Sequence, residues 1–355
     1  GSHLSHEFGY TVQEIELDGF TIHHRVEMLL SSDTSVGVSK SLGLGVIGFA
    51  DALESLKPDL VLVLGDRYEI LAAATAAMVR RIPIAHIQGG ELTEGAVDDA
   101  IRHSITKMAH LHFVAAEEYR DRVIQMGEQP ERVFNVGGLG VESVKRTKLM
   151  SRDEVEESLG IKFSSPSFLV TFHPVTLEPE SLALQFEQVL QGLKCFDSAQ
   201  FLFTMPNADS GGRLIRTEIE RFCSEVVEAH YFESLGQHLY LSTMAQVDAV
   251  VGNSSSGLLE APAIGVWTIN IGTRQDGRLK ASSVIDCEAT RDSVIEAIER
   301  VTSEDFVDSM DNIHNPYGSG EAGQAIVSLL ENAMGARLIR KTFNNLVQRL
   351  DAPQA

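Results

Sequence analysis

The sequence predicts an α/β protein built from doubly wound parallel sheets. Short, nearly continuous apolar runs recur along its 355 residues, among them LVLVL at 60–64 and FLVTF at 168–172. Such runs are typical of strands that are covered on both faces, as in parallel sheets. Helical patterns such as EILAAATAAMVRR at 69–81 separate the runs, and this alternation indicates β-α-β units.

The predicted strands fall into two groups. The first group is LVLVL (60–64), IPIAHI (82–87), LHFVA (111–115) and VFNV (133–136), and the second is FLVTF (168–172), FLFT (201–204), AVV (249–251) and VWTINI (266–271). Between them, Ser151 and Glu154 form a capping-box pattern, and Gly160 and the polar stretch KFSSPS follow. We therefore expect a first domain at 1–160 and a second at 161–335. Residues 336–355 are predicted to form a C-terminal helix that packs back on the first domain.

Composition narrows the class of protein. Hydrophobic residues make up 43% and charged residues 22% of the chain, as in ordinary globular proteins, and no apolar run approaches the length of a membrane span. The net charge of -21 argues against nucleic acid or an anionic membrane as a partner. The three cysteines are scattered, which is typical of reduced thiols in a cytoplasmic protein. No Cys/His cluster has zinc spacing, so we expect no metal and no cofactor.

Polar residues follow the predicted strands, at the strand ends where open parallel sheets bind ligands. Gly65 permits a tight turn before Asp66 and Arg67, which are either a catalytic carboxylate with a ligand-binding arginine or the cap of the next helix. After the second strand, Gln88 and two glycines precede Glu91. Paired glycines let a ligand approach the backbone. Glu91 is then a second carboxylate at a strand end, or a turn residue.

Four further residues stand at similar places. Asp98 and Arg102 are four positions apart and share a helix face, either at a ligand site or as an exposed salt bridge. His173 follows a strand, where histidine can bind phosphate or shuttle a proton, although a lone histidine is more often structural. Asn207 follows FLFT and can hydrogen-bond a sugar hydroxyl or form a turn.

The stretch VGNSSSGLLE at 251–260 predicts a nucleotide site. The free N–H groups and the positive dipole end of a helix that starts at these serines would bind an anion such as a diphosphate. Glu260 lies about one turn further on, where its carboxylate can accept from two vicinal hydroxyls, as on a ribose, and Arg274 follows the next strand. The alternative is an ordinary serine N-cap with a surface glutamate. The candidate ligand residues at the helix start are Asn253, Ser254, Ser255 and Gly257.

Together these stretches resemble the hydrolysing UDP-N-acetylglucosamine 2-epimerases of sialic-acid synthesis. The matching segments, spread from about Phe8 to the final helices, are GDRYEI, PIAHIQGGE, DDAIRHSITKMAH, FHPVT, PNADSG, GNSSSGLLE and INIGTRQDGR. The resemblance implies a glycosyltransferase-B-type fold, in which two Rossmann-like domains face a cleft and the second holds UDP. It also implies a homodimer or homotetramer that converts UDP-N-acetylglucosamine to N-acetylmannosamine and UDP, by elimination of UDP and hydration of the glycal.

The resemblance also assigns roles to individual residues. Asp66 and Asp98 are placed among the acid/base groups, and Glu91 and His173 complete the set of catalytic candidates. Around the sugar and the diphosphate it places Arg102, His173 and Asn207, and UDP is held by Arg67, Ser254, Ser255, Glu260 and Arg274.

Two features depart from the family's pattern. Gln88 stands where some members have glutamate and others histidine, and glutamine cannot titrate. Either Asp66 and Asp98 suffice, or Glu91 contributes, or the substrate differs. The family also has a strand, a helix and a strand before the segment that GSHLSHEFG resembles, so we expect the first domain of this chain to lack them.

Other functions remain open on the sequence alone. The same reaction on a UDP-linked 2,4-diacetamido-2,4,6-trideoxyhexose, as in legionaminic-acid pathways, is the nearest alternative. A non-hydrolysing epimerase would retain the UDP-sugar instead of releasing UDP. A glycosyltransferase on the same fold would need an acceptor, and a nucleotide-sugar-binding regulator would lack catalysis.

Overall fold

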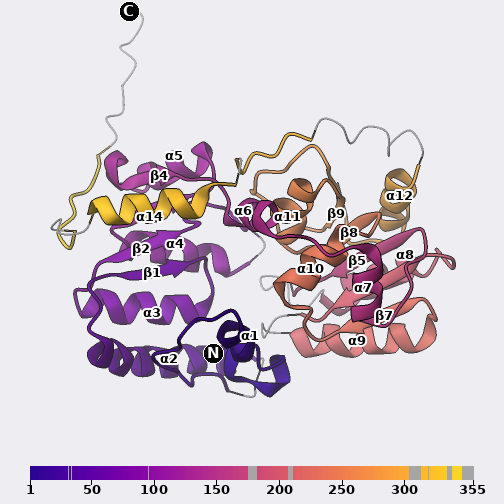
Figure 1. Ribbon diagram of the computed structural model, residues 1–355, viewed down its shortest axis with the longest axis horizontal. Helices are drawn as coiled ribbons and strands as arrows, with labels where there is room; N and C mark the ends of the chain where they lie inside the picture. Colours follow the sequence, from indigo (N-terminus) through magenta and orange to yellow (C-terminus); the bar gives the residue numbers. More distant parts are fainter. Residues whose placement is uncertain are drawn as a thin grey trace, which may run out of the picture.

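The computed structural model describes residues 1–30, 32, 34–94, 96–174, 182–206, 211–303, 313–318, 320–333 and 338–345. Two separate parallel sheets lie side by side, each with its own helices (Figure 1). The predicted α/β class with two Rossmann-like domains is therefore confirmed. We call the unit around the first sheet the first domain and the unit around the second sheet the second domain.

The first sheet has four parallel strands in the order β1-β2-β3-β4. Helix α3 and helix α4 cover one face, where Ile84 and Ile105 are buried together, and α14 covers the other, where Ile326 packs against Ala85 and Phe113. The elements are β1 (Val61–Leu64), β2 (Ile84–Ile87), β3 (Leu111–Val114), β4 (Val133–Asn135), α2 (Ser35–Leu56), α3 (Tyr68–Val79), α4 (Asp98–Met108), α5 (Glu117–Gln125) and α14 (Ala322–Ala333).

The second sheet has six parallel strands in the order β10-β9-β8-β5-β6-β7. Its strand order reverses between β5 and β8, and such a switch point is where doubly wound sheets bind ligands. The strands are β5 (Ser167–Thr171), β6 (Gln200–Thr204), β7 (Ala229–Phe232), β8 (Ala249–Gly252), β9 (Trp267–Ile271) and β10 (Val284–Cys287). The helices are α8 (Leu182–Leu193), α9 (Gly212–Glu225), α10 (Gly236–Met244), α11 (Ser256–Ile264) and α12 (Arg291–Val301).

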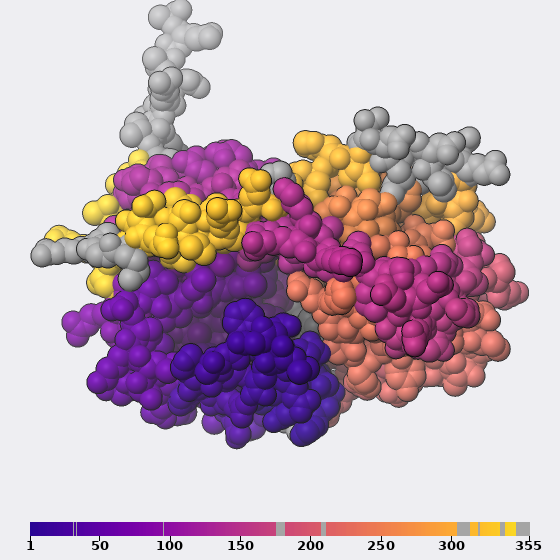
Figure 2. Space-filling view, viewed as in Figure 1, coloured from indigo at the N-terminus to yellow at the C-terminus, as the bar shows by residue number. Residues whose placement is uncertain are grey.

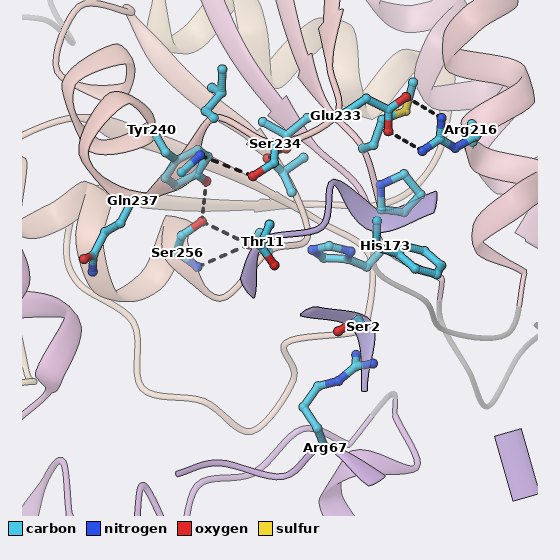
Figure 3. Close-up of a pocket in the computed structure, with 18 residues that line it drawn as sticks. Ser2, Thr11, Arg67, His173, Arg216, Glu233, Ser234, Gln237, Tyr240 and Ser256 are labelled. Carbon is cyan, nitrogen blue, oxygen red and sulfur yellow. Dashed lines mark hydrogen bonds and ion pairs between the residues drawn. The ribbon is translucent and has the colours of Figure 1, made fainter. Parts of the chain in front are cut away.

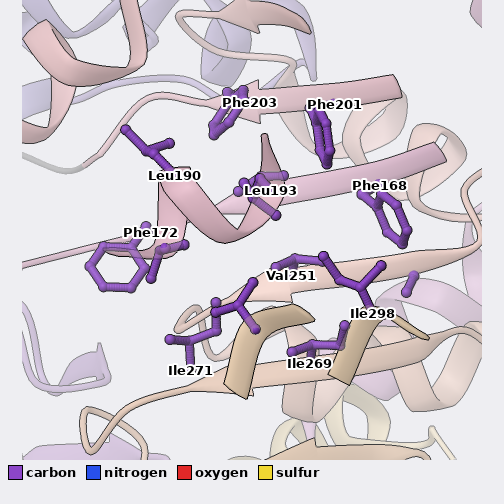
Figure 4. Packing of buried hydrophobic residues seen from close by; sticks show 14 of the residues in the cluster. Phe168, Phe172, Leu190, Leu193, Phe201, Phe203, Val251, Ile269, Ile271 and Ile298 are labelled. Carbon is purple, nitrogen blue, oxygen red and sulfur yellow. The ribbon is translucent and has the colours of Figure 1, made fainter. Parts of the chain in front are cut away.

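Two of these strands, β7 and β10, are missing from the predicted set. Both are edge strands with only one fully buried residue in four, so neither carries the continuous apolar run that marks a central strand. The central strands do carry it, and Figure 4 shows the result. Phe168 and Phe201 stack at 5.8 Å between ring centroids, under Leu193 of α8 and Ile298 of α12.

The remaining elements connect the two domains or precede them. The N-terminal segment, indigo in Figures 1 and 2, lies at the junction between the domains on the face shown. Glu7 of this segment accepts from Arg213 Nη2 of α9 at 3.1 Å, which ties the segment to the second domain. These elements are the 3-10 turns Ser2–Leu4, His6–Phe8 and Pro130–Arg132 and the helices α1 (Val12–Leu17), α6 (Leu139–Arg146) and α7 (Arg152–Leu159).

Helix α2 is the one helix among the described residues with the length and apolar composition of a membrane span. The sequence reading did not single it out because glycine and serine residues interrupt its apolar positions. Here α2 packs along α3, where a Cβ on Gly45 would lie 2.9 Å from the Cβ of Ala72. Only 28% of its most apolar window is buried, and Val36 and Ile47 on it are exposed.

The predicted C-terminal helix over 336–355 is not present in its described part, because residues 338–345 are extended. Their backbone groups bond to the first domain instead of to one another. Arg132 donates to the carbonyls of Leu338 and Arg340, and the N–H of Asn344 donates to Gly127 O at 2.8 Å. The helix that lies across the first domain is α14 (Figure 1).

Glu128 anchors this C-terminal segment. Its side chain is 3% exposed and accepts from Lys341 Nζ at 2.9 Å, from Lys107 Nζ at 2.5 Å and from His112 Nε2 at 3.1 Å. Burial raises the pKa of Glu128, but the hydrogen bonds from His112, Lys107 and Lys341 outweigh burial and bring the pKa down to about 2. The charged carboxylate therefore stabilises the folded chain.

We expect Glu128→Gln to cost about 3 kcal/mol of unfolding free energy at pH 7, because its partners lower the pKa of the carboxyl from 4.5 to about 2 and this stabilisation is lost with the charge. The native carboxyl keeps its charge below the ordinary value of 4.5, so this stabilisation is present above pH 4.5 and is lost as the pH falls toward 2. Urea unfolding at each pH should therefore show the gap between wild type and variant narrowing by about half between pH 5 and pH 3. The exposed neighbour variant Glu131→Gln is the control. A gap that is constant over this range would contradict the account.

Candidate active site

The tip of β1 is held by a buried histidine that the sequence analysis did not single out. His86 on β2 is fully buried, and burial lowers its pKa to about 4, so the ring is neutral at pH 7. Nε2 lies 2.8 Å from the carbonyl of Gly65, which can only accept, so Nε2 carries the proton. Nδ1 then accepts from Thr106 Oγ1 at 3.2 Å. This pair of bonds fixes Gly65, with φ at +78°, directly before Asp66.

Arg102 connects Asp66 to the turn that carries Glu91. Its side chain is 1% exposed, so it is not the exposed salt bridge of the alternative interpretation. One nitrogen, Nη2, pairs with Asp66 and donates to Thr93 Oγ1 at 2.8 Å, and Nη1 donates to the carbonyl of Glu91 at 2.8 Å. Arg102 is thus fully engaged inside the first domain and fixes the Asp66 carboxylate. Asp98 begins α4, one turn before Arg102, and is partly exposed.

Gln88 and the two glycines after it form the turn that buries Glu91. Gln88 has φ at +63°, in the left-handed region that non-glycine residues rarely adopt, and its N–H donates to Phe113 O at 2.8 Å. Gly90 has φ at +80°, and a Cβ there would lie 2.4 Å from the carbonyl oxygen of Tyr119. The turn therefore passes directly beneath α5, and Glu91 beyond it is only 2% exposed.

Asn253 ties together the strand tips at the switch point of the second sheet. Its buried side chain accepts from the N–H of His173 at 2.7 Å and donates to the carbonyl of His173 at 2.9 Å. Its own carbonyl accepts from Arg274 Nη1 at 3.1 Å and from Gln275 Nε2 at 2.7 Å. With both ends of its amide used, Asn253 holds His173 and Arg274 in place. This geometry favours a positioning role over direct contact with a ligand.

The serine run opens α11 as the sequence predicts, with Ser255 as the N-cap residue. Ser254 Oγ lies 3.0 Å from Ser256 Oγ, which lies 2.6 Å from the hydroxyl of Tyr240. Gly257 serves packing, because a Cβ there would lie 2.6 Å from Thr268 Cγ2 of β9. The N–H groups of the first turn bond locally, those of Gly257 and Leu258 to the carbonyls of Ser254 and Ser255, so the helix start offers its positive dipole end and a group of hydroxyls.

A cavity of about 530 Å³ lies between these parts, within the size range of small-molecule sites (Figure 3). Of the predicted site residues, Arg67 reaches it from the first domain, and His173 and Ser254 reach it from the second. The other described candidates are not among the residues that line it, and Asn207 lies outside the described residues. The cavity is also lined by residues that sequence reasoning missed: Ser2, Phe8, Thr11, Thr171, Thr204, Met205, Pro206, Arg216, Glu233, Ser234, Leu235, Gly236, Gln237, Tyr240 and Ser256.

Arg216 and Glu233 form an ion pair in the missed lining. Glu233 directly follows β7 and pairs with both terminal nitrogens of Arg216, one of them at 2.5 Å. Like Asp66 and His173, Glu233 stands at the end of a strand, where the sequence analysis looked for ligand-binding residues. It was missed because β7 itself, with the sequence AHYF, does not have the pattern of a buried strand.

Glu260 is buried against the first domain. Its Oε1 lies close enough to α6 that a Cβ on Gly140 would be 2.6 Å away, and its Oε2 is buried with no hydrogen-bond partner among the described residues. Burial raises the pKa of Glu260 to about 7, with a smaller contribution from the nearby charge of Glu91. The carboxyl is therefore about half protonated at neutral pH.

Known proteins resemble this chain along most of its length. The family described as UDP-N-acetylglucosamine 2-epimerase matches residues 1–331. The GDP/UDP-N,N'-diacetylbacillosamine 2-epimerase (hydrolyzing) of Campylobacter jejuni is 41% identical over 307 residues, which cover 86% of this chain and 79% of that protein. The polysialic acid biosynthesis protein P7 of Escherichia coli is 38% identical, over 89% of this chain and 81% of that protein.

The fold also has a counterpart among solved structures. A UDP-GlcNAc 2-epimerase from Neisseria meningitidis bound to UDP-GlcNAc superimposes with a TM-score of 0.78, over 91% of this chain and 89% of that one. The identity in this comparison is 21%, so it bears on the fold alone.

Proposed function

Since the chain belongs to the UDP-N-acetylglucosamine 2-epimerase family, we propose that it is a hydrolysing 2-epimerase of a UDP-linked 2-acetamido sugar. The reaction removes the proton from C2 of the sugar while the bond from C1 to the diphosphate oxygen breaks, which gives a glycal and UDP. Water then adds across the double bond, with hydroxyl to C1 and a proton to the opposite face of C2. The products are the free C2-epimeric sugar and UDP.

One observation carries the proposal: residues from the two domains meet at one cavity. Arg67, beside Asp66 at the tip of β1, lines the cavity opposite His173 and Ser254 at the switch point of the second sheet. A weakly acidic C2 proton needs a fixed base, and a departing diphosphate needs positive charge. In our proposal Asp66 and Asp98, with Glu91 as a further candidate, handle the protons.

The diphosphate would bind at the start of α11. There the positive end of the helix dipole, the hydroxyls of Ser254 and Ser255, and the cations Arg67 and Arg274 would offset the net charge of -21. His173 would lie beside the leaving oxygen. Because its backbone is fixed on both sides by Asn253, its imidazole can be held in one place.

The ribose of UDP would bind Glu260. Its buried Oε2 has no hydrogen-bond partner among the described residues, and two vicinal hydroxyls would supply donors to it. Such donors favour the charged form of a carboxylate, so bound UDP lowers the pKa of Glu260 from its value of about 7.

We therefore expect UDP binding to release up to about half a proton at pH 7 and to tighten as the pH rises through 7. Calorimetry in buffers of different ionisation enthalpy measures this release directly. Glu260→Gln should bind UDP more weakly and release no proton, whereas Glu296→Gln on the exposed face of α12 should behave as wild type. Proton release that persists in Glu260→Gln would contradict the ribose assignment.

The identity of the sugar is the finer part of the proposal. The resemblance described above predicts UDP-N-acetylglucosamine. The activity for which the Campylobacter jejuni relative is named favours UDP-N,N'-diacetylbacillosamine as the second candidate. Gln88, at the turn before Glu91, is the residue whose departure from the family's pattern most favours a different substrate.

Release of UDP from each nucleotide sugar alone, and then from both together, tests the proposal. The true substrate should be turned over with the higher kcat/KM and should inhibit turnover of the other one in the mixture. UDP release from neither sugar would contradict the proposed function and favour an acceptor-dependent transferase or a binding protein.

A further inference from the structure

A loop of the second domain docks on the turn of the first domain that carries Glu91. Asp276 O accepts from the N–H of Glu94 at 3.2 Å. Gly277 has φ at +82°, and a Cβ there would lie 2.6 Å from the Cβ of Leu92, so the two backbones meet closely only because this position is glycine. We call this contact the clasp; it joins residues 276–279 to residues 91–94.

Arg278 makes the polar contacts at the centre of the clasp. Its Nη2 lies 3.2 Å from Glu91 Oε2, and its Nε donates to the carbonyl of Leu92 at 3.2 Å. The two side chains are 9% and 2% exposed, so water screens their charges little. The other carboxylate oxygen, Glu91 Oε1, is buried without a hydrogen-bond partner among the described residues. Arg278 therefore fixes one oxygen of the Glu91 carboxylate.

A closed ring of hydrogen bonds holds the loop directly after Arg278. The N–H of Leu279 donates to the hydroxyl of Tyr119 at 3.0 Å, and the hydroxyl of Tyr317 donates to the carbonyl of Leu279 at 2.8 Å. The two tyrosine hydroxyls lie 3.0 Å apart. Because the Tyr317 proton is used on Leu279, Tyr119 donates to Tyr317. Both rings are fully buried, so the backbone next to Arg278 is anchored against α5.

The clasp is also connected to Asp66, the first carboxylate of the proposed catalytic set. The carbonyl of Glu91 accepts from Arg102, which in turn pairs with Asp66. An arginine of the second domain is therefore connected, through one glutamate and one buried arginine, to the carboxylate at the tip of β1. Opening of the two domains would break the link at Arg278, because every other step lies within the first domain.

We propose that Arg278 is a positioning residue that sets Glu91, and through Arg102 also Asp66, in their working arrangement only when the two domains are closed. This inference rests on the proposed epimerase function. Arg278 acts through Glu91 and not on the sugar. The fixed position of its guanidinium selects one orientation of the Glu91 side chain. Domain closure and proton transfer at C2 are thereby coupled.

The test compares Arg278→Gln and Arg278→Lys with wild type in the full chain. In Arg278→Gln, kcat for UDP release should fall about 100-fold, while KM and the UDP dissociation constant change less than about threefold, because UDP binds mainly to the second domain in our proposal. Arg278→Lys should restore part of kcat, because lysine can still pair with Glu91 but has one donor nitrogen where arginine has two.

Lys280→Gln is the matched control. Lys280 lies two residues further on and pairs with Asp286 at 2.8 Å within the second domain, so its loss removes a cation without touching the clasp. It should leave kcat and KM as in wild type.

The outcomes separate this inference from the function on which it rests. A wild type that releases UDP from neither nucleotide sugar would overturn both. An active wild type combined with an Arg278→Gln variant of unchanged kcat would overturn the inference alone. So would a loss confined to KM, or equal losses in Arg278→Gln and Lys280→Gln, because these would indicate general loosening of the loop.

Discussion

Replacement of Asp66 by asparagine should lower kcat for UDP release by about 10³-fold and leave the affinity for UDP unchanged. Asparagine has the shape of aspartate but cannot accept the C2 proton. The UDP site lies mainly on the second domain in our proposal, so loss of this carboxylate removes chemistry and not binding. Initial rates of UDP release and calorimetric titration with UDP measure the two effects separately.

Two further variants serve as controls for this test. Asp66→Asn leaves the buried Arg102 with a weaker set of partners, so a loss of folding has to be excluded by the thermal unfolding midpoint. Asp66→Glu keeps the charge and should retain more activity than asparagine. Asp51→Asn, on the exposed face of α2, should match wild type. If Asp66→Asn folded and kept more than about a tenth of the wild-type kcat, Asp66 would not be the base.

Replacement of Gly252 by alanine should abolish UDP binding and cost about 3 kcal/mol or more of unfolding free energy. Gly252 ends β8 with φ at +135°, and a Cβ there would lie 1.9 Å from the carbonyl oxygen of Thr171 on β5. The two strand tips that carry Asn253 and His173 would have to separate. The hydrogen bonds between these residues, and with them the switch-point site, would then be lost.

Gly160→Ala is the control that introduces backbone strain without a steric clash of the added Cβ. Gly160 also has a positive φ, at +68°, but a Cβ there meets nothing within 4 Å, so the cost should be only about 1 kcal/mol and UDP binding should persist. If Gly252→Ala fails to fold, Gly257→Ala is the milder variant, because its Cβ meets a side-chain methyl of Thr268. Calorimetry with UDP and urea unfolding provide the measurements. Wild-type UDP affinity in a folded Gly252→Ala would contradict the assignment of the site to the switch point.

The sequence predicts the parts of the fold whose pattern is local. Continuous apolar runs identify the central strands, and the position of Asp66, His173 and the serine run follows from where those runs end. Edge strands such as β7 lack the pattern, so the sequence did not predict that Glu233 and its partner Arg216 line the site. The segment 338–345 was wrongly predicted as helix because its structure depends on distant partners, Arg132 and Gly127, rather than on its own residues.

The site shows the same division between local and distant information. The sequence places Asp66, Glu91 and Arg102 near one sheet edge, but their pairing depends on tertiary contacts. Arg102 shares a helix face with Asp98, yet it pairs with Asp66 and Asp99. The contact of Glu91 with Arg278 joins residues almost 190 positions apart across two domains, and no spacing rule predicts it. Asn253 illustrates the converse, since its place was predicted while its hydrogen bonds were not.

The central claim is that UDP leaves by elimination and that water then adds to the glycal. The most direct measurement is proton NMR of the full-length protein incubated in heavy water with UDP-N-acetylglucosamine and, separately, with UDP-N,N'-diacetylbacillosamine. Our account predicts that one of them yields UDP together with a free C2-epimeric sugar that carries deuterium at C2. Release of UDP with the C2 proton retained and the configuration unchanged would indicate simple hydrolysis and contradict the account.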